Sequence, residues 1–302
     1  MPDFQEWLSG VLIPVTTPFD PVTGEVAPVS MRENIRRWTA EPIDGIVLFG
    51  STGEGILLDE DEKLRLTAMV RDVMPGGLPL VAGAGAESTR ATARQAQRLA
   101  ESGADAVLVH APSYFGPSLS PAAVRDHFVA VADASPVPVI VYHIPKFAKV
   151  TMEPGLVGEL ARHPNIRGLK DSSGDVKRFA EYTTVCGREC ALFMGNGSLL
   201  YTALELGAAG GIVAVGLLAP GLCAEIVSAF RSGETQRAGQ LQERIAPVHR
   251  EVVAPFGAQG LKAALELIGY VGGPPRAPLK PLGEKERAQV ARVMQDAGLL
   301  PG

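Results

Sequence analysis

The stretch VPVIVYHIP at residues 137–145 shows most plainly how this chain folds. Val139, Ile140 and Val141 are consecutive apolar residues, so both faces of a strand in this run are apolar. Strands of this kind are typical of a parallel sheet with helices outside and packed side chains inside. The run therefore predicts a buried parallel strand.

Seven further runs of the same kind are spread along the chain. They are VLIPVTTPF (11–19), GIVLFGS (45–51), LPLVAGAG (78–85), AVLVHAP (106–112), NIRGLKDS (165–172), ALFMGNG (191–197) and GIVAVG (211–216). Amphipathic segments separate them, and this eightfold alternation of strand and helix predicts an α/β protein with a (β/α)8 TIM barrel. A doubly wound open sheet gives a similar alternation, but no dinucleotide-binding glycine fingerprint follows the first run.

The helix ends support this assignment. Ser88 is placed to cap a helix that runs to Gly103, and Ser120 with Pro121 marks the start of a helix that runs to residue 133. After the eighth strand we expect a C-terminal helical appendage, with helices near 220–231, 235–253, 259–270 and 284–297. We expect residues 1–231 to form the barrel, and residues 232–302 to extend the same domain.

Composition excludes several classes of protein. Of the 302 residues 46% are hydrophobic and 20% are charged, as in a globular protein with a large core. The net charge of −5, without a basic block, argues against a nucleic-acid partner. The apolar run at 210–220 is shorter than the roughly 20 residues that cross a bilayer, so we expect no membrane partner. Three cysteines are too few for a disulfide framework, and MPDFQEW does not resemble a signal peptide. A cytoplasmic location is expected.

The carboxyl ends of the strands are where a barrel of this type places its chemistry. Lys170 and Tyr142 end neighbouring predicted strands at similar heights. Alternation puts Ile166, Gly168 and Lys170 on one face of their strand, so an inward Gly168 leaves space beside the amine. A buried lysine amine is a nucleophile that can attack a carbonyl and form a Schiff base. The alternative is a lysine that points into solvent.

Tyr142 adds the second group that this chemistry needs. Schiff-base formation requires a proton to leave the amine and water to leave the carbinolamine, and a phenol beside both can carry that proton. A core tyrosine with its hydroxyl on a backbone carbonyl is the alternative.

Two glycine-rich loops are further candidates. GSTGEG at 50–55 offers closely spaced backbone N–H groups and two hydroxyls, which suit a carboxylate or an oxyanion, although such a loop alone is a weak signal. The loop at 195–197 has the glycines of a phosphate cradle but lacks basic residues beside it. The five histidines show no metal-ligand spacing, so we expect no metal.

Three motifs together resemble the dihydrodipicolinate synthase and N-acetylneuraminate lyase superfamily of pyruvate-dependent class I aldolases. They are GSTGE at 50–54, Tyr142-x-x-Pro145 and GLKDSSGD at 168–175, and the similarity covers nearly the whole chain. The resemblance implies that Lys170 forms a Schiff base with a 2-keto acid and that Tyr142 is the acid/base tyrosine. No separate cofactor is implied, because the lysine itself forms the covalent adduct.

The same resemblance assigns the rest of the site. The backbone amides of Ser51 and Thr52 look like the pair that holds the keto-acid carboxylate. The hydroxyls of Ser51, Tyr142 and Tyr114 match the family's proton relay. Because the residue at Tyr114 enters the neighbouring subunit's site in many members, a homo-oligomer is implied, either a dimer or a homotetramer built as a dimer of dimers. Gly195 and Val213 match positions that line the pyruvate pocket.

The chain departs from the family pattern where the second substrate binds. Synthases that take aspartate semialdehyde usually carry an arginine two residues after the proline of the fifth strand, and this chain has Phe147 there. A phenyl ring cannot hold a carboxylate through paired hydrogen bonds. The usual asparagine after the tyrosine is His143, and Lys146 and Lys149 are possible substitutes for the arginine. Which of His143, Lys146 and Phe147 contacts the second substrate stays open.

These features make 4-hydroxy-2-oxoglutarate, cleaved to pyruvate and glyoxylate, the expected substrate. HPNIRGLKDSSGDV at 163–176 and GYVGGPPRAPL at 269–279 are similar to stretches of 4-hydroxy-2-oxoglutarate aldolases. Dihydrodipicolinate synthase, a 2-keto-3-deoxy sugar-acid aldolase or dehydratase, and an aromatic hydratase-aldolase remain alternatives. Outside this chemistry, a barrel that binds a keto acid for regulation and a phosphate-binding barrel enzyme are further alternatives.

Overall fold

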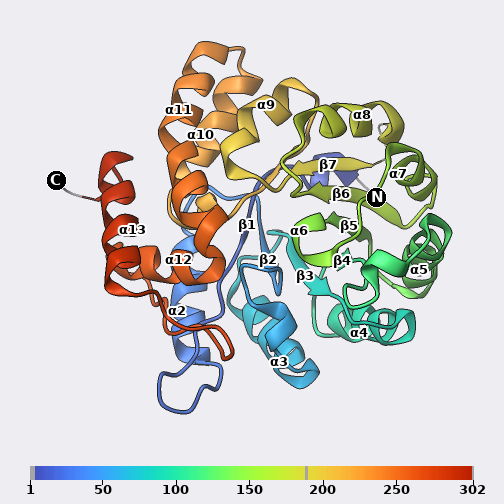
Figure 1. The fold of residues 1–302 in the computed structure, drawn as a ribbon, viewed down its shortest axis with the longest axis horizontal. Helices are drawn as coiled ribbons and strands as arrows, with labels where there is room; N and C mark the ends of the chain where they lie inside the picture. The colour runs from blue at the N-terminus through green and yellow to red at the C-terminus, as the bar shows by residue number, and fades with distance from the viewer. Residues whose placement is uncertain (1–3, 188–189, 301–302) are drawn as a thin grey trace.

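A computed structural model describes residues 4–187 and 190–300 of the chain. In this part of the chain, the strands are parallel and pair in sequence order to form a closed barrel. Helices surround the barrel (Figure 1). The strands are β1 (Gly10–Pro14), β2 (Gly45–Leu48), β3 (Leu80–Ala84), β4 (Ala106–His110), β5 (Val139–His143), β6 (Ile166–Asp171), β7 (Ala191–Met194) and β8 (Gly210–Ile212). The predicted TIM barrel is confirmed.

Glycines close the barrel between β1 and β8. Gly10 pairs with Gly210, and a Cβ added at Gly210 would lie 1.9 Å from the Gly10 carbonyl oxygen. Gly10 itself has a φ of +82°, which favours glycine. The observed strands are shorter than the predicted runs because the carboxyl end of each run continues as a loop. These loops carry most of the candidate site residues.

The helices begin largely where the sequence places their caps. Ser88 accepts a hydrogen bond from the backbone N–H of Ala91, and Ser120 accepts one from Ala123, as predicted. Asp59 and Glu62 form a capping box at the start of α3. The helices of the barrel are α1 (Phe4–Trp7), α2 (Pro28–Trp38), α3 (Glu60–Val73), α4 (Thr89–Glu101), α5 (Pro121–Ala134), α6 (Pro145–Ala148), α7 (Pro154–Leu160), α8 (Val176–Cys186), α9 (Leu200–Glu205) and α10 (Pro220–Arg231).

The C-terminal helices are α11 (Thr235–Val248), α12 (Ala254–Leu267) and α13 (Glu284–Asp296). A π-helical turn, η5 (His249–Val253), continues α11 up to the start of α12. Within α12, Gly257 has non-helical backbone angles and separates two helical pieces, so the expectation of a new helix from about residue 259 agrees with the structure.

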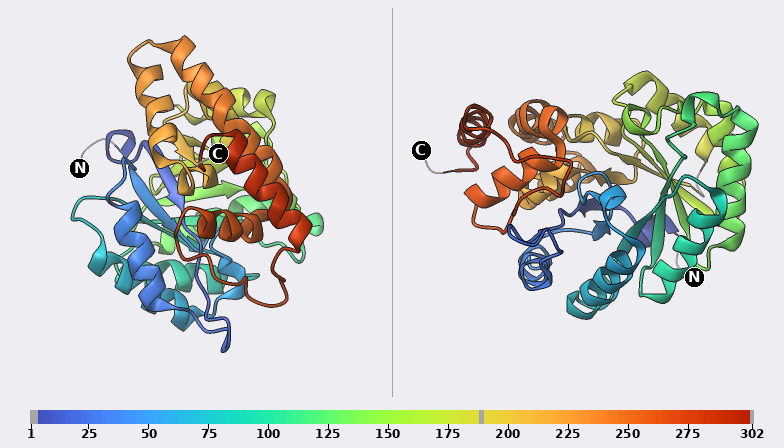
Figure 2. Two further views of the ribbon diagram at one scale, coloured as in Figure 1. Left: turned by 90° about the vertical axis from the view of Figure 1, so that its left-hand side faces the viewer. Right: turned by 60° about the horizontal axis from the view of Figure 1, so that its bottom comes forward.

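The appendage packs against one side of the barrel, next to α10 and α2 (Figure 2). The Asn34 side chain of α2 donates to the Val271 carbonyl and accepts from the Val271 N–H, and Trp38 stacks on Tyr270 at 5.0 Å between ring centroids. The helical appendage is therefore confirmed, while its boundary at residue 231 stays a prediction. None of the helices described here is both long and apolar enough to cross a membrane.

One face assignment along β6 was wrong. The pairing of β5 with β6 shifts by one residue, so that Val139 faces Ile166 and the next residue, Ile140, faces Gly168. Such a bulge moves the side chains on one side of it to the other face. As a result Ile166 does not share a face with Gly168 and Lys170.

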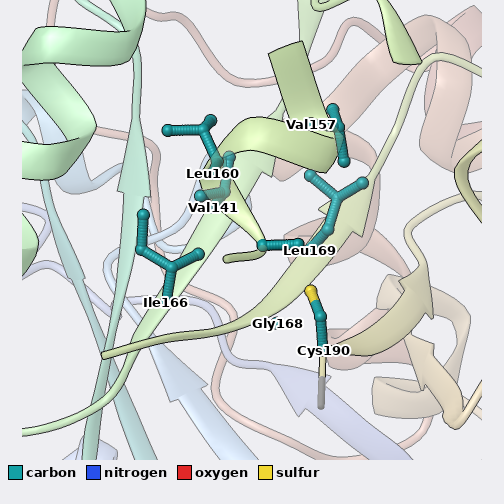
Figure 3. A pocket seen from close by; sticks show the side chains of 8 residues that line it. Val141, Val157, Leu160, Ile166, Gly168, Leu169 and Cys190 are labelled. Atoms are coloured by element: carbon teal, nitrogen blue, oxygen red, sulfur yellow. The ribbon is translucent and has the colours of Figure 1, made fainter. Parts of the chain in front are cut away.

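Figure 3 shows where Ile166 lies instead. It lines an apolar cavity of about 10 Å³ with Val141 and Leu169 of the outer barrel face and Val157 of α7. A space of this size holds at most about one water molecule, and its walls offer that water no polar partners. The cavity is a packing defect between the barrel and its helices.

Candidate active site

Lys170 and Tyr142 are direct partners across the β5–β6 pair. The Lys170 Nζ atom lies 4.2 Å from the centroid of the Tyr142 ring. Lys170 is 4% exposed and Tyr142 is 6% exposed, so the alternative of a solvent-facing lysine does not hold. In the described part of the chain, no carboxylate forms an ion pair with Lys170. Its amine is therefore next to an aromatic ring rather than a counter-ion.

The residue below the lysine contributes to this space. Gly168 is on the same face as Lys170, and a Cβ added there would lie 3.4 Å from the Ile140 side chain and 3.1 Å from the Ala191 carbonyl oxygen. A larger residue would crowd Ile140 and the Ala191 carbonyl. That a glycine here leaves space beside the amine stays a prediction.

His143 lies on the opposite face of β5 and is 1% exposed. Its Nδ1 is 2.8 Å from Asp171 Oδ1, and its Nε2 accepts a hydrogen bond from the Met152 N–H. With Nε2 as the acceptor, Nδ1 carries the proton and donates it to Asp171. The Tyr182 hydroxyl completes the cluster by donating to the Met152 carbonyl. His143 therefore holds β5 and β6 to the outer layer and does not face the space beside Lys170.

The GSTGEG loop follows β2 and is tightly built. Phe49 has a φ of +57°, an unusual value for a bulky side chain, and a Cβ added at Gly55 would lie 2.0 Å from its carbonyl oxygen. The Gly50 carbonyl accepts from Gly53 and Gly55, and the Thr17 hydroxyl donates to the Gly53 carbonyl. Strain of this kind persists where the surroundings fix the backbone, and it gathers at functional sites.

The backbone N–H groups of Ser51 and Thr52, predicted to hold the keto-acid carboxylate, are available for a ligand. Ser51 is exposed and Thr52 is half-buried. Across the residues that the structure describes, neither backbone N–H donates to a protein acceptor. Two adjacent free N–H groups are what a carboxylate needs.

Tyr114 stands apart from the lysine in the single chain. It is 79% exposed, and its ring packs edge-on against Phe115 with the centroids 5.0 Å apart. The loop is fixed from below, because the Glu87 carboxylate accepts hydrogen bonds from the N–H groups of Ser113 and Tyr114 and from the Ser113 hydroxyl. The structure therefore presents Tyr114 outward and does not bring it to Tyr142 within one chain.

Gly195 and Val213 follow β7 and β8. A Cβ added at Gly195 would lie 1.9 Å from the Ser172 hydroxyl oxygen, so only glycine fits there. Val213 is fully buried. In the same loop as Gly195, the Gly197 N–H donates to His249 Nδ1, so this amide is not free for a phosphate. This contact counts against the phosphate-cradle alternative.

Phe147 lies on α6, directly after β5, and is 54% exposed. The amines of the two nearby lysines donate hydrogen bonds to backbone carbonyls. Lys146 Nζ donates to the Ala254 carbonyl at 3.0 Å, and Lys149 Nζ donates to the Lys146 carbonyl at 3.0 Å. Neither lysine takes the position of the arginine that Phe147 replaces.

Sequence reasoning gave no role to Glu54, Lys262 and Arg276, which form a charged cluster where the GSTGEG loop meets the C-terminal segment; Glu54 and Lys262 are buried and Arg276 is partly buried. The glutamate at the end of GSTGE was the one residue in the sequence that could have indicated this cluster. The residues around it give no indication that its partners lie near the C-terminus. In residues 4–187 and 190–300, no three histidine, cysteine or carboxylate side chains are grouped as metal ligands.

Comparisons with known proteins identify the family of this chain. The sequence profile described as the Dihydrodipicolinate synthetase family matches residues 7–297. The chain is 34% identical to a 4-hydroxy-tetrahydrodipicolinate synthase of Acidiphilium cryptum over 96% of this chain and 99% of that protein. It is 33% identical to the protein of that name from Methanopyrus kandleri, over 97% of this chain and 98% of the relative.

Solved structures show the same likeness. Dihydrodipicolinate synthase DapA-2 of Bacillus anthracis superposes with a TM-score of 0.90 at 29% identity, covering 95% of this chain and 97% of that one. The chloride-inhibited dihydrodipicolinate synthase of Acinetobacter baumannii, solved with pyruvate, superposes with a TM-score of 0.92 at 28% identity, covering 97% and 99%. The chain belongs to the dihydrodipicolinate synthetase family and is an enzyme of the lyase class.

Proposed function

We propose that Lys170 forms a Schiff base with pyruvate or a closely related 2-keto acid. The Nζ atom attacks the C2 carbonyl, and the carbinolamine then loses water to give the iminium. The Tyr142 hydroxyl moves the protons for both steps. The observation that carries this proposal is the buried contact of 4.2 Å between the Lys170 amine and the Tyr142 ring on paired strands.

The keto-acid carboxylate then binds the GSTGEG loop. The open N–H groups of Ser51 and Thr52 donate to it, while Gly195 and Val213 line the pocket around the rest of the molecule. Loss of a C3 proton from the iminium gives an enamine, which joins an aldehyde through a new C–C bond. In the reverse direction, the iminium accepts the electron pair of the C–C bond that breaks, and the same enamine results.

The reaction is completed by a second copy of the chain. Tyr114 and Phe115 form an exposed aromatic pair on a loop that Glu87 holds in place. A homo-oligomer, either a dimer or a tetramer, would cover this pair and bring Tyr114 to the Tyr142 of a neighbouring subunit. There its hydroxyl would continue the proton relay with Ser51.

The first candidate reaction is the condensation of pyruvate with aspartate semialdehyde, and the names of the relatives support it. Cleavage of 4-hydroxy-2-oxoglutarate, the substrate expected from the sequence, is the second candidate. The observation that favours it is Phe147, with both neighbouring lysines engaged elsewhere. A site without a guanidinium at this position lacks the paired hydrogen bonds for the carboxylate of aspartate semialdehyde.

Steady-state kinetics with both substrates tests the proposal. The purified enzyme is given pyruvate with aspartate semialdehyde, and separately 4-hydroxy-2-oxoglutarate, and kcat/KM is compared. If kcat/KM for one substrate exceeds that for the other by at least about 100-fold, the preferred substrate identifies the reaction. A difference of this size corresponds to roughly two charged hydrogen bonds. Turnover of neither substrate, with no covalent adduct of pyruvate, would contradict the proposal and favour a regulatory keto-acid-binding barrel.

A further inference from the structure

The Glu54 carboxylate, at the end of the GSTGE motif, is buried beneath the loop. Its side chain is 1% exposed, and its Oε1 lies 2.5 Å from the Nζ of Lys262, whose side chain is 2% exposed. Its Oε2 accepts a hydrogen bond of 2.8 Å from the Arg276 N–H. The loop that carries Ser51 and Thr52 is thus tied to α12 and to the segment that follows α12.

A second ion pair reinforces the first. The Arg276 guanidinium makes two hydrogen bonds of 2.6 Å to the Glu62 carboxylate, in the paired geometry typical of arginine, and it also donates to the Leu57 carbonyl. Glu62 in turn accepts from the Asp59 N–H in the capping box of α3. Both ends of the connection between β2 and α3 are therefore held by residues of the C-terminal segment.

The Phe19 ring contacts both cations. Lys262 Nζ and Arg276 Cζ each lie 4.4 Å from the centroid of its ring, and cations attract an aromatic face at this distance. Phe19 belongs to the loop after β1, which also carries Thr17 and its hydrogen bond to the Gly53 carbonyl. The ends of β1 and β2 and the C-terminal segment thus share one buried cluster.

Two glycines of the GGPPRAPL stretch (272–279) allow its backbone to lie close to Phe19 and Lys262. Gly273 has a φ of +68°, and a Cβ added there would lie 2.9 Å from the Phe19 carbonyl oxygen. A Cβ added at Gly272 would lie 2.3 Å from the Lys262 carbonyl oxygen. The Lys262 ammonium also donates to the Pro274 carbonyl at 2.8 Å. The backbone of this stretch therefore lies close to the backbone at Lys262 and at Phe19.

We propose that Glu54 and Lys262 are positioning residues, through which the C-terminal segment fixes the Ser51 and Thr52 amides that bind the keto-acid carboxylate. This inference rests on the proposed function. The barrel alone supplies the lysine and the tyrosine, but the conformation of the carboxylate-binding loop depends on residues some two hundred positions later in the chain. The appendage is part of the substrate site without touching the substrate.

The test measures the KM for pyruvate and kcat in Glu54→Gln and Lys262→Gln. Each variant removes the ion pair and keeps a side chain of similar length. We expect KM to rise about tenfold, the equivalent of one charged hydrogen bond, with kcat within about threefold of the wild type. Hydrogen exchange of the peptide that spans residues 49–57 is expected to accelerate in both variants.

Glu225→Gln is the matched control, because it breaks an exposed ion pair between α10 and Arg237 of α11 and should leave KM, kcat and exchange unchanged. If the two buried-pair variants do not fold, Arg276→Lys keeps the charge and loses the paired geometry, and its KM and exchange replace theirs.

An unchanged KM in a folded variant would overturn the proposal, as would a loss confined to kcat. Borohydride trapping of pyruvate on the wild type separates this failure from failure of the proposed function, since it requires Lys170 and does not depend on the variants.

Discussion

Tyr142 and Lys170 face each other across neighbouring strands, with the lysine Nζ 4.2 Å from the centre of the tyrosine ring. Both side chains are buried, although one is charged in solution and the other carries a hydroxyl. A buried polar side chain is costly unless it has a partner or a function. The arrangement fits the proposed chemistry, in which the amine attacks a carbonyl and the phenol carries protons.

Replacing Tyr142 with phenylalanine tests the proposed proton relay. The ring and its packing remain, but the group that moves protons is lost, so we expect kcat to fall about 10²- to 10³-fold. The KM for pyruvate should change by no more than a few-fold. Stopped-flow measurement of Schiff-base formation shows whether the loss lies in that step. A kcat within threefold of the wild type would contradict the assignment of Tyr142.

Tyr182 provides a contrasting substitution on the outer side of the same strands. Tyr182→Phe removes the donor to the Met152 carbonyl and leaves that buried acceptor without this partner. We expect the free energy of unfolding to fall by about 1–3 kcal/mol, measured by urea denaturation. Since the His143 cluster faces away from Lys170, kcat and KM below the melting transition should stay within twofold. A large change in KM for the second substrate would show that this cluster belongs to the substrate site.

Phe147→Arg tests how the second substrate is recognised. An arginine at this position offers paired hydrogen bonds to a carboxylate, so the KM for aspartate semialdehyde should fall about tenfold. Phe147→Lys is the control, because a point charge cannot make the paired contact, and its effect should be smaller. Equal KM values in the wild type and both variants would show that residue 147 does not contact the second substrate.

The stability of the fold should depend on pH through His127. Burial lowers the pKa of His127 to about 4, from its ordinary value of 6.5. The folded state therefore keeps the ring neutral, while the unfolded chain takes up a proton as the pH falls below 6.5. Stability is fully present above pH 6.5 and is lost as the pH falls from 6.5 to about 4, by about 3 kcal/mol.

Denaturation midpoints at several pH values check this dependence. His249 has a pKa lowered to about 4 by burial as well, so it contributes over the same range. In His127→Asn the free energy of unfolding should depend less steeply on pH than in the wild type. The dependence that remains belongs to His249. If the variant kept the full wild-type dependence of stability on pH, the pKa of His127 would not differ between the folded and the unfolded chain.

The sequence was sufficient for the barrel and for the lysine–tyrosine pair, because both follow from local pattern. Apolar runs mark the strands, and the last residues of neighbouring parallel strands must meet at one rim. The bulge before Gly168 could not be predicted, because one extra residue in a strand leaves no sign in its composition. Ile166 was placed on the wrong face for this reason.

The Glu54 cluster was missed for a different reason. Glu54 and Arg276 are 222 residues apart, and a contact at that separation depends on how the appendage packs. His143 is an intermediate case. Its place next to Tyr142 in the strand already implies the opposite face, and the structure adds the partner, Asp171, that explains its burial.

Borohydride reduction in the presence of pyruvate, followed by intact mass measurement and peptide mapping, tests whether Lys170 forms the Schiff base. We expect one pyruvate-derived adduct, on Lys170, and none in Lys170→Arg. Lys63 is the demanding control, because burial lowers its pKa to about 8 and makes it a competing nucleophile. An adduct on Lys63 instead of Lys170, or no adduct on the folded protein with pyruvate in excess, would show that Lys170 is not the Schiff-base lysine.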